Sequence, residues 1–247
     1  MKRGKLIFLC LILLTSLALP CILFADEETE NLISIVIESF DNDTKASDWI
    51  VQGSKFATEE YPKIAIAEGW PEALHGANWD EKDYEVLAVS TKYDRTGYNY
   101  VELIPVKTAD DGSIELNPLS LKGRVKSLDL WVLGTRYDYY IEAHIRDYRG
   151  VIHVLNLGNL KYEGWKNLKA NIPSYIPQSS NYAPYFKGLE LVKLMVWTTP
   201  QEKVDDYIMF IDQIKILTDD FITRFDGDDL LQPDKLNSIN WSDQTGE

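Results

Sequence analysis

The feature that most constrains this chain is a two-residue alternation of apolar and polar side chains within short segments. In residues 137–158, "YDYYIEAHIRDYRGVIHVLNLG", Ile141, Ala143 and Ile145 alternate with polar or aromatic residues. Successive side chains of an extended chain point to opposite faces, so this spacing predicts a strand with one face in the core. The dipeptide Arg149-Gly150 is the predicted turn of a hairpin.

Similar short runs continue along the chain, separated by Gly, Pro and Asp, and no long stretch keeps helical periodicity. The runs are "LISIVIESF", "DWIVQGSKF", "KIAIAE", "YEVLAVSTKY", "YNYVELIPV", "SIELNPL", "SLDLWVLG", "GWKNLKANIP", "LELVKLMVWT" and "YIMFIDQIKIL". About ten short strands predict an all-β sandwich. The long insertion "AEGWPEALHGANWDEKD" favours the jelly-roll form, with "PEAL" as a helical turn. We predict one sandwich domain over residues 26–218 and an acidic, extended or partly disordered tail over residues 219–247.

The predicted turn also assigns faces to the return strand of the hairpin. With Arg149-Gly150 as the turn, Ile152 and Val154 continue the apolar face of Ile141. His153, like Leu155, then lies on the opposite face together with His144. The core should form where Ile141, Ala143 and Ile145 pack against Leu128, Leu130 and Val132 of the preceding strand.

The first 25 residues have the three parts of a secretory signal peptide. Lys2, Arg3 and Lys5 precede the apolar run "LIFLCLILLTSLALPCILF", and Ala25 offers a cleavage position before Asp26. An uncleaved membrane anchor is the alternative, since the run is nearly long enough to span a bilayer. The acidic stretch that follows the run favours cleavage.

Cleavage would remove both cysteines of the chain, Cys10 and Cys21. Pro20 makes the sequence before Cys21 a poor match to a lipoprotein signal. The exported chain of 222 residues is then free of cysteine, which excludes disulfides, thiol nucleophiles and cysteine metal sites. It is long enough to bury a core of its own.

The charge of the exported chain excludes two classes of partner. Removing the three basic residues of the signal peptide leaves 22 basic and 39 acidic side chains, which gives a net charge of −17. Nucleic acid is bound by neutralising phosphates with Lys and Arg, and an anionic membrane surface attracts cations. We therefore predict no nucleic-acid partner and no membrane partner after cleavage.

Metal and catalytic sites have weak support in the sequence. His144 and His153 with Glu142 could bind zinc, but surface histidines explain them as well. Acidic pairs that could bind calcium are also explained as solvated turns; they are Asp205-Asp206, Asp219-Asp220 and Asp228-Asp229. A glycosidase needs two carboxylates across a cleft, whereas Glu102, Glu142 and Glu190 occur singly. We predict no enzyme activity, no cofactor and no metal.

Aromatic side chains are the remaining signal of function. Trp131 has the parity that leaves the core, as Tyr140 and Tyr148 do, and flat aromatics on a sheet face bind sugars or bury in protein interfaces. With His144 and His153, these residues form the predicted interaction surface, which we place on one outer face. From these residues alone, the surface could contact another protein or bind a glycan.

Several segments resemble the outer-layer (sheath) proteins of spirochaete periplasmic flagellar filaments. They are "YPKIAIAEGWPEAL", "LAVSTKYDRTGYNYVELIP", "LDLWVLGTRYDYYIEAHIRDYRGVIHVLNLGNL", "GWKNLKANIP" and "VWTTPQEKVDDYIMFIDQIKILTD", followed by "FDG". The resemblance runs roughly from Ser39 to Gly227.

The resemblance implies an exported structural protein of the periplasmic flagellum. It implies a fold like the jelly rolls of carbohydrate-binding modules, contacts with flagellin-like core proteins and other sheath subunits, and an influence on filament shape, stiffness and motility. It supplies no catalytic residues. The alternatives are a secreted carbohydrate-binding module, for peptidoglycan or another glycan, that uses Trp131, and a calcium-dependent lectin.

The signal peptide generates a first testable prediction. The native exported chain should begin at Asp26, because the cationic segment, the apolar run and Ala25 occur in the order that signal peptidase requires. Mass spectrometry of the native N-terminus measures this. A lipid-modified Cys21, or retained residues before Asp26, would contradict it.

Overall fold

The computed structural model describes residues 30–77, 84–178, 188–219, 230 and 233–239. The chain divides into two units, residues 1–30 and residues 31–247, and the second contains every strand described below. The predicted signal peptide lies outside the described residues, as do Phe221, Phe225, Leu231 and Trp241 of the predicted tail.

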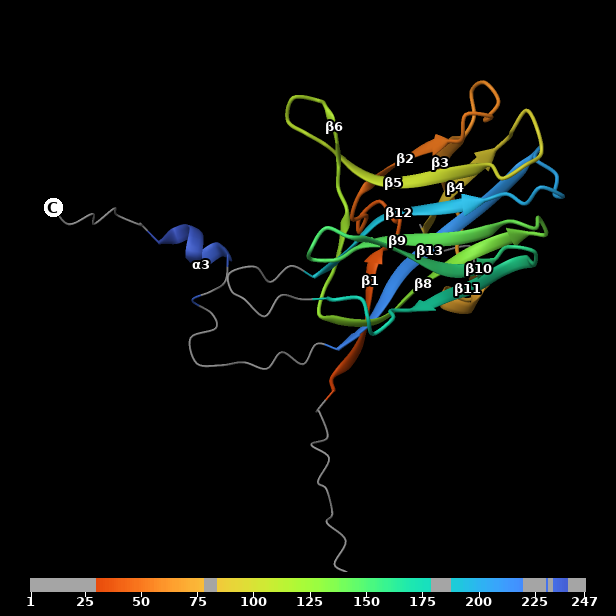
Figure 1. The fold of residues 1–247 in the computed structure, drawn as a ribbon. Helices are drawn as coiled ribbons and strands as arrows, with labels where there is room; N and C mark the ends of the chain where they lie inside the picture. The colour runs from red at the N-terminus through yellow and green to blue at the C-terminus, as the bar shows by residue number, and fades with distance from the viewer. Residues whose placement is uncertain (1–29, 78–83, 179–187, 220–229, 231–232, 240–247) are drawn as a thin grey trace, which may run out of the picture. The chain divides into compact units, whose positions relative to one another are not determined.

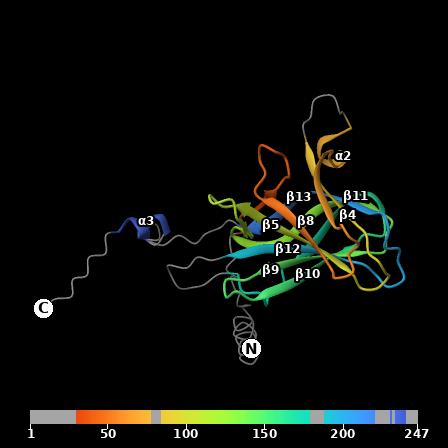
Figure 2. The same ribbon diagram turned by 90° about the horizontal axis from the view of Figure 1, so that it is seen from above.

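Thirteen strands of the described residues form two antiparallel sheets that pack face to face (Figures 1 and 2). The six-stranded sheet has the order β11 (Glu163–Asn171), β8 (Arg124–Thr135), β13 (Tyr207–Asp219), β4 (Glu85–Thr91) and β3 (Lys63–Glu68), with β1 (Leu32–Glu38) also paired to β13. The seven-stranded sheet has the order β10 (Ile152–Asn159), β9 (Tyr140–Arg146), β12 (Leu189–Trp197), β5 (Tyr100–Thr108) and β2 (Asp48–Gly53). Its two short strands, β6 (Ile114–Leu116) and β7 (Leu119–Leu121), pair with β5 and β12. This is the predicted all-β jelly-roll sandwich.

Every predicted run contains a strand, and the described helices are short. The predicted helical turn "PEAL" overlaps α2 (Glu72–His75), and α3 (Pro233–Ser238) lies in the segment predicted to be an irregular tail. No helix in the described parts of the chain is long and apolar enough to cross a membrane.

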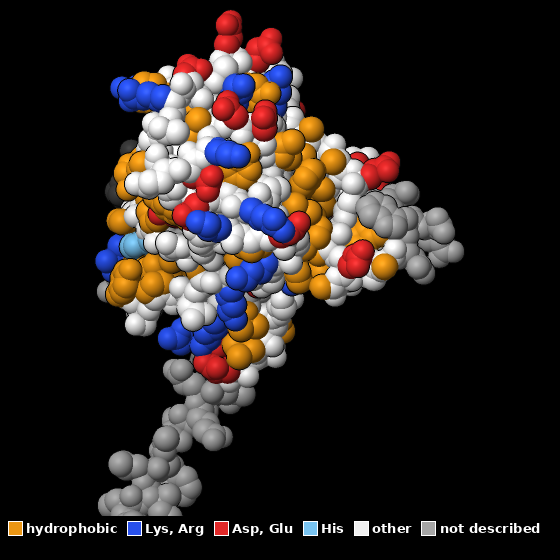
Figure 3. Space-filling model, turned by 90° about the vertical axis from the view of Figure 1, so that its right-hand side faces the viewer, with side chains coloured by type: hydrophobic (Ala, Val, Ile, Leu, Met, Phe, Trp, Pro, Cys, Tyr) orange, Lys and Arg blue, Asp and Glu red, His pale blue; other side chains and the backbone are white. Residues whose placement is uncertain are grey.

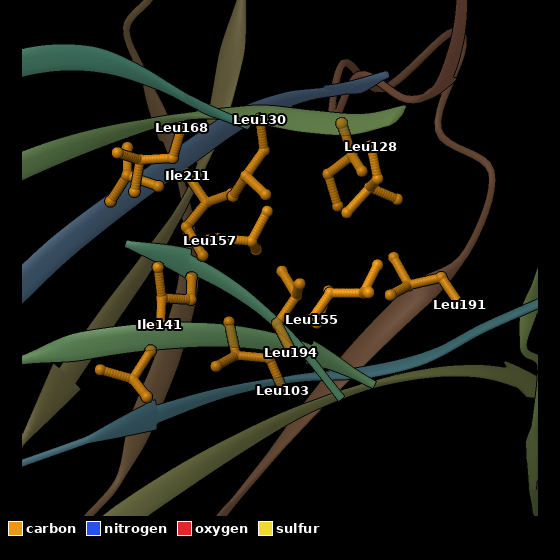
Figure 4. Packing of buried hydrophobic residues seen from close by; sticks show 14 of the residues in the cluster. Leu103, Leu128, Leu130, Ile141, Leu155, Leu157, Leu168, Leu191, Leu194 and Ile211 are labelled. Atoms are coloured by element: carbon orange, nitrogen blue, oxygen red, sulfur yellow. The ribbon is translucent and has the colours of Figure 1, made fainter. Parts of the chain in front are cut away.

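The core lies between the two sheets and is built from the alternation seen in the sequence. Along β9 the burial pattern alternates strictly, so that Ile141, Ala143 and Ile145 are fully buried. Leu128, Leu130 and Val132 of β8 are also fully buried and belong to the same hydrophobic cluster, as predicted. Figure 4 shows leucine and isoleucine side chains from the two sheets pointing toward one another across this interior.

The return strand of the β9–β10 hairpin has the opposite face assignment from the one predicted. The backbone N–H of Asp147 donates to the carbonyl of Val151 (2.9 Å), which leaves a three-residue loop rather than a two-residue turn. Gly150 has a φ of +87°, the left-handed conformation that a three-residue loop needs in its last position. One extra loop residue shifts the register by one, and a one-residue shift moves every side chain to the other face.

The consequence is visible in burial along β10. Leu155 and Leu157 are buried in the core, whereas Ile152 and Val154 are 45% and 53% exposed. In the pairing with β9, Val154 stands opposite His144, and His153 stands opposite the core residue Ile145. The prediction that His144 and His153 share a face was therefore wrong.

The connection between the sheets depends on one buried carboxylate. Glu38, at the end of β1, is 1% exposed. Its Oε1 accepts hydrogen bonds from the backbone N–H groups of Phe40 (3.2 Å) and Ala46 (3.0 Å). Its Oε2 accepts hydrogen bonds from the N–H of Ser47 (3.1 Å) and from the indole N–H of Trp49 (3.0 Å). Trp49 belongs to β2, a strand of the seven-stranded sheet. Glu38 thus ties β1 of one sheet to β2 of the other.

The hairpin generates the second prediction. Replacing Ile141 with Ala should lower the free energy of unfolding by roughly 2–5 kcal/mol, because the deleted atoms are fully buried and leave a cavity. The matched control is Ile152→Ala on the neighbouring strand, where the side chain is exposed. Chemical denaturation measures both variants, and equal losses would show that β10 has its faces reversed.

Candidate interaction surfaces

The five residues of the predicted interaction surface lie in four different places. Tyr140 and His144 project from β9 on the outer face of the seven-stranded sheet. Trp131 projects from the outer face of the six-stranded sheet, on the other side of the sandwich. Tyr148 lies in the hairpin loop and His153 on the core side of β10. The prediction of one shared face was wrong because β8 and β9 are consecutive strands of different sheets.

His153 has a structural partner in the hairpin loop. Its Nε2 lies 2.9 Å from Oδ2 of Asp147, a residue that is 4% exposed. The Oδ1 atom of Asp147 accepts the backbone N–H groups of Arg149 (2.9 Å) and Val151 (3.0 Å). The hydrogen bonds from His153, Val151 and Arg149 outweigh the effect of burial and hold the pKa of Asp147 below its ordinary value. Asp147 and His153 therefore stabilise the turn.

Three aromatic side chains form a row across the outer face of the seven-stranded sheet. Trp197 of β12 stands opposite Tyr140 of β9 on one side and opposite Tyr100 of β5 on the other. The ring centroids of Trp197 and Tyr140 are 6.4 Å apart with planes only 15° from parallel, and Tyr100 meets Trp197 edge-on at 5.2 Å. We call these three residues the aromatic row. All three side chains are partly exposed.

Polar side chains fill the neighbouring rows of the same face. Glu142 Oε2 accepts a hydrogen bond from the Trp197 indole (2.9 Å), which fixes the orientation of that ring. Lys193 donates to Glu102 Oε1 (2.6 Å). Further along, Arg146 and Glu190 form an ion pair (2.7 Å). This face therefore presents aromatic rings beside charged groups that already have partners.

His144 lies next to this network, close to one of its carboxylates. Its Nε2 is 3.5 Å from Glu142 Oε2. Burial, and then the charge of Lys193, lower the pKa of His144, so the imidazole is neutral near pH 7. His153, its predicted partner in a zinc site, lies on the other face of the hairpin. Among the described residues no group of three or more His, Cys, Asp or Glu side chains could hold a metal ion.

The outer face of the six-stranded sheet has a different chemistry. Leu133 of β8 stands opposite both Trp165 of β11 and Phe210 of β13, and Phe210 stands opposite Ala88 of β4. These four residues, which we call the apolar row, are partly exposed. Ile208, two residues from Phe210 on the same strand, is 44% exposed. Figure 3 views the molecule from the right-hand side of Figure 1, toward the ends of the strands, where hydrophobic side chains lie among charged ones.

Trp131 lies in the next row of this face, opposite a buried carboxyl group. Asp212 of β13 pairs with Trp131 and is 2% exposed. Within the described residues neither Asp212 Oδ1 nor the Trp131 indole nitrogen has a hydrogen-bond partner. Burial raises the pKa of Asp212 to about 7, although a backbone hydrogen bond from Gln213 opposes the rise. Gln213 has a φ of +48° in the bulge that follows, where β13 has one residue more than β8.

Two packed antiparallel sheets define a β-sandwich protein. A comparison with protein families identifies the group: the chain belongs to the flagellar filament outer layer protein FlaA family, whose model matches residues 40–226. The match agrees closely with the segment over which the sequence resembles sheath proteins.

Curated relatives come from spirochaetes. A flagellar filament outer layer-like protein of Brachyspira hyodysenteriae is 23% identical over 201 residues, which cover 81% of this chain and 86% of that protein. A flagellar filament outer layer protein of Borreliella burgdorferi is 23% identical over 113 residues, or 42% of this chain and 33% of that protein.

Solved structures with a similar fold include carbohydrate-binding modules. One, from a study of promiscuous modules of the β-sandwich superfamily, is 10% identical with a TM-score of 0.46, and the match covers 72% of this chain and 60% of that one. Another is a module of Caldicellulosiruptor saccharolyticus in complex with mannohexaose. It is 10% identical with a TM-score of 0.42, and the match covers 76% of this chain and 97% of that one.

Asp212 generates the third prediction. The folded pKa of about 7 lies above the value of about 3.9 for an unfolded chain, so the folded protein keeps a proton that the unfolded chain releases. The associated stabilisation is therefore lost as the pH rises from about 4 through 7. The amide side chain of the Asp212→Asn variant cannot ionise. The free energy of unfolding of this variant should exceed that of the wild type by on the order of 2–4 kcal/mol at pH 8, and the difference should be small at pH 4.

Chemical denaturation between pH 4 and pH 8 tests this expectation. The control is Asp110→Asn. Asp110 is exposed, so this replacement removes one negative charge from the surface and does not change a buried group. If the Asp212→Asn variant is more stable than the wild type by the same amount at every pH, the buried carboxyl of Asp212 does not have a raised pKa.

Proposed function

We propose that this chain is a structural subunit of the outer layer of the periplasmic flagellar filament. In this role it is exported, loses residues 1–25 and coats a core of flagellin-like subunits beside other sheath subunits. By stiffening and shaping the filament, the layer contributes to motility. Its role is structural rather than catalytic. Membership of the filament outer layer family supports this proposal.

The observation that carries the proposal is the apolar row on the six-stranded sheet. Trp165, Leu133, Phe210 and Ala88 follow one another across four adjacent strands. Aromatic and aliphatic side chains with few charges are typical of the core of a protein interface. A subunit of a filament layer must bury part of its surface against neighbours, and the apolar row offers a continuous strip of uncharged side chains across four strands.

The contact need not be strong in each subunit. A layer repeats the same contact along the filament, and linked weak contacts give a high overall affinity. Trp131 lies in the row next to the apolar row and is partly exposed, so a neighbour bound on this face would cover its ring. This makes Trp131, the predicted residue on this side, part of the proposed contact.

The fourth prediction tests the contact on purified periplasmic filaments. Trp165→Ala combined with Phe210→Ala should lower the amount of this chain on filaments by about tenfold or more, since truncating interface anchors costs on the order of 2 kcal/mol each. Quantitative immunoblotting of filaments measures the occupancy, and thermal melting of the isolated variant checks that it folds.

The matched control is Tyr100→Ala combined with Tyr140→Ala, two aromatics from the other outer face. A folded apolar-row variant at normal occupancy would show that this face is not the contact. Absence of the wild-type chain from purified filaments would contradict the proposed function itself.

A further inference from the structure

We propose that the outer face of the seven-stranded sheet is a binding site for a neutral glycan, with the aromatic row as its platform. This activity goes beyond a structural role in the filament layer and does not depend on it. The site consists of Tyr100, Trp197 and Tyr140, together with the polar side chains Glu142 and Glu102 in the adjacent row.

The first argument is the arrangement of the rings. Tyr140, Trp197 and Tyr100 occupy one line across β9, β12 and β5, so they follow one another perpendicular to the strands. The planes of Trp197 and Tyr140 differ by only 15°. Sugar rings have apolar C–H faces that pack on aromatic rings, and aromatics aligned across a sheet offer consecutive sugars of one chain such contacts.

The second argument is that the central ring is held in place. The indole of Trp197 donates to Glu142 Oε2, and Trp197 has an aromatic neighbour on each side. A platform whose orientation is already fixed loses little side-chain entropy when a ligand binds. An incidental surface tryptophan has no need of such a partner.

The third argument is the hydrogen-bonding capacity beside the rings. Glu142 and Glu102 both stand opposite Met195, the residue of β12 two positions before Trp197. Lys193 pairs with Glu102 and leaves other lone pairs of that carboxylate available. Apolar rings with a few fixed polar groups are the combination that recognises small polar molecules with apolar faces, and glycans have both features.

Charge indicates which glycans fit. Glu102 and Glu190 are each paired with a cation, Lys193 and Arg146 respectively. His144 is neutral near pH 7, which leaves Glu142 as the uncompensated charge of this group. Neither a polyanionic glycan nor a nucleic acid would be favoured here, so the site suits neutral hexose or N-acetylhexosamine chains.

The charged groups beside the aromatic row favour a glycan over a protein on this face. Charged residues are depleted at the core of protein interfaces, yet here they occupy the rows next to the rings. The apolar row of the six-stranded sheet has the composition expected of a protein contact. The exposed apolar side chains of the seven-stranded sheet lie on β10, β2 and β6, outside the three strands of the aromatic row; they include Val154, Ile50 and Leu116.

The fifth prediction tests retention by glycans directly. The exported chain is run in affinity gels that contain galactomannan, xyloglucan or hydroxyethyl cellulose, and is separately incubated with purified peptidoglycan sacculi. At least one of these probes should retain the wild type. Trp197→Ala and Tyr140→Ala should each weaken that retention by about tenfold or more, since each removes a stacking surface.

Two further variants keep the outcome decisive. Tyr100→Ala serves if Trp197→Ala fails to fold. Removing Trp197 also removes its hydrogen bond to Glu142, whereas removing Tyr100 leaves that bond in place. Trp165→Ala, on the other sheet, should keep full retention. The sacculus arm separates a peptidoglycan ligand from the soluble neutral polysaccharides.

Retention by none of the probes would overturn the proposal, as would folded aromatic-row variants that are retained like the wild type. If these variants leave glycan retention unchanged but lower filament occupancy, the face is a protein contact and the glycan proposal is wrong. Normal filament occupancy with lost glycan retention would support the site while leaving the filament role intact.

Discussion

The hydrogen bonds received by Glu38 join the two halves of this fold. A carboxylate buried without partners would be strongly destabilising, so its four donors are as necessary to Glu38 as Glu38 is to them. The donors come from Phe40, Ala46, Ser47 and Trp49, along the segment that crosses from one sheet to the other. Because the crossover has a fixed path, β1 and β2 enter different sheets, and the interior between them can close around mostly apolar side chains.

Closing the sandwich in this way separates its two outer faces and lets each have its own chemistry. Trp131 and Tyr140 are only nine residues apart in sequence, yet they project from opposite sides because β8 and β9 belong to different sheets. One face aligns Trp165, Leu133 and Phe210, while the other aligns aromatic rings with carboxylates and lysine. A residue pattern along one strand does not reveal this, since each row is assembled from strands distant in sequence.

Much of the fold could be predicted because it depends on local alternation. The strands, the jelly-roll class and the burial of Ile141, Leu128 and Leu130 in one core all follow from which side chains repeat at every second position. The face of β10 could not be predicted with the same security, because it depends on whether the loop has two or three residues. Gly150 permits either, and the hydrogen bond from Asp147 to the carbonyl of Val151 selects the longer loop.

The candidate surfaces were harder to predict than the fold for a related reason. Trp197 joins Tyr140 and Tyr100 only through the strand order β9–β12–β5, in which none of the neighbours is consecutive in sequence. The sequence marks each aromatic separately but does not say which become neighbours. Once the order is known, the two faces point in opposite directions, so a protein bound to the apolar row does not cover the aromatic row. A subunit held in a layer through the six-stranded sheet would therefore keep its glycan site open, and the two proposed contacts can be made at the same time.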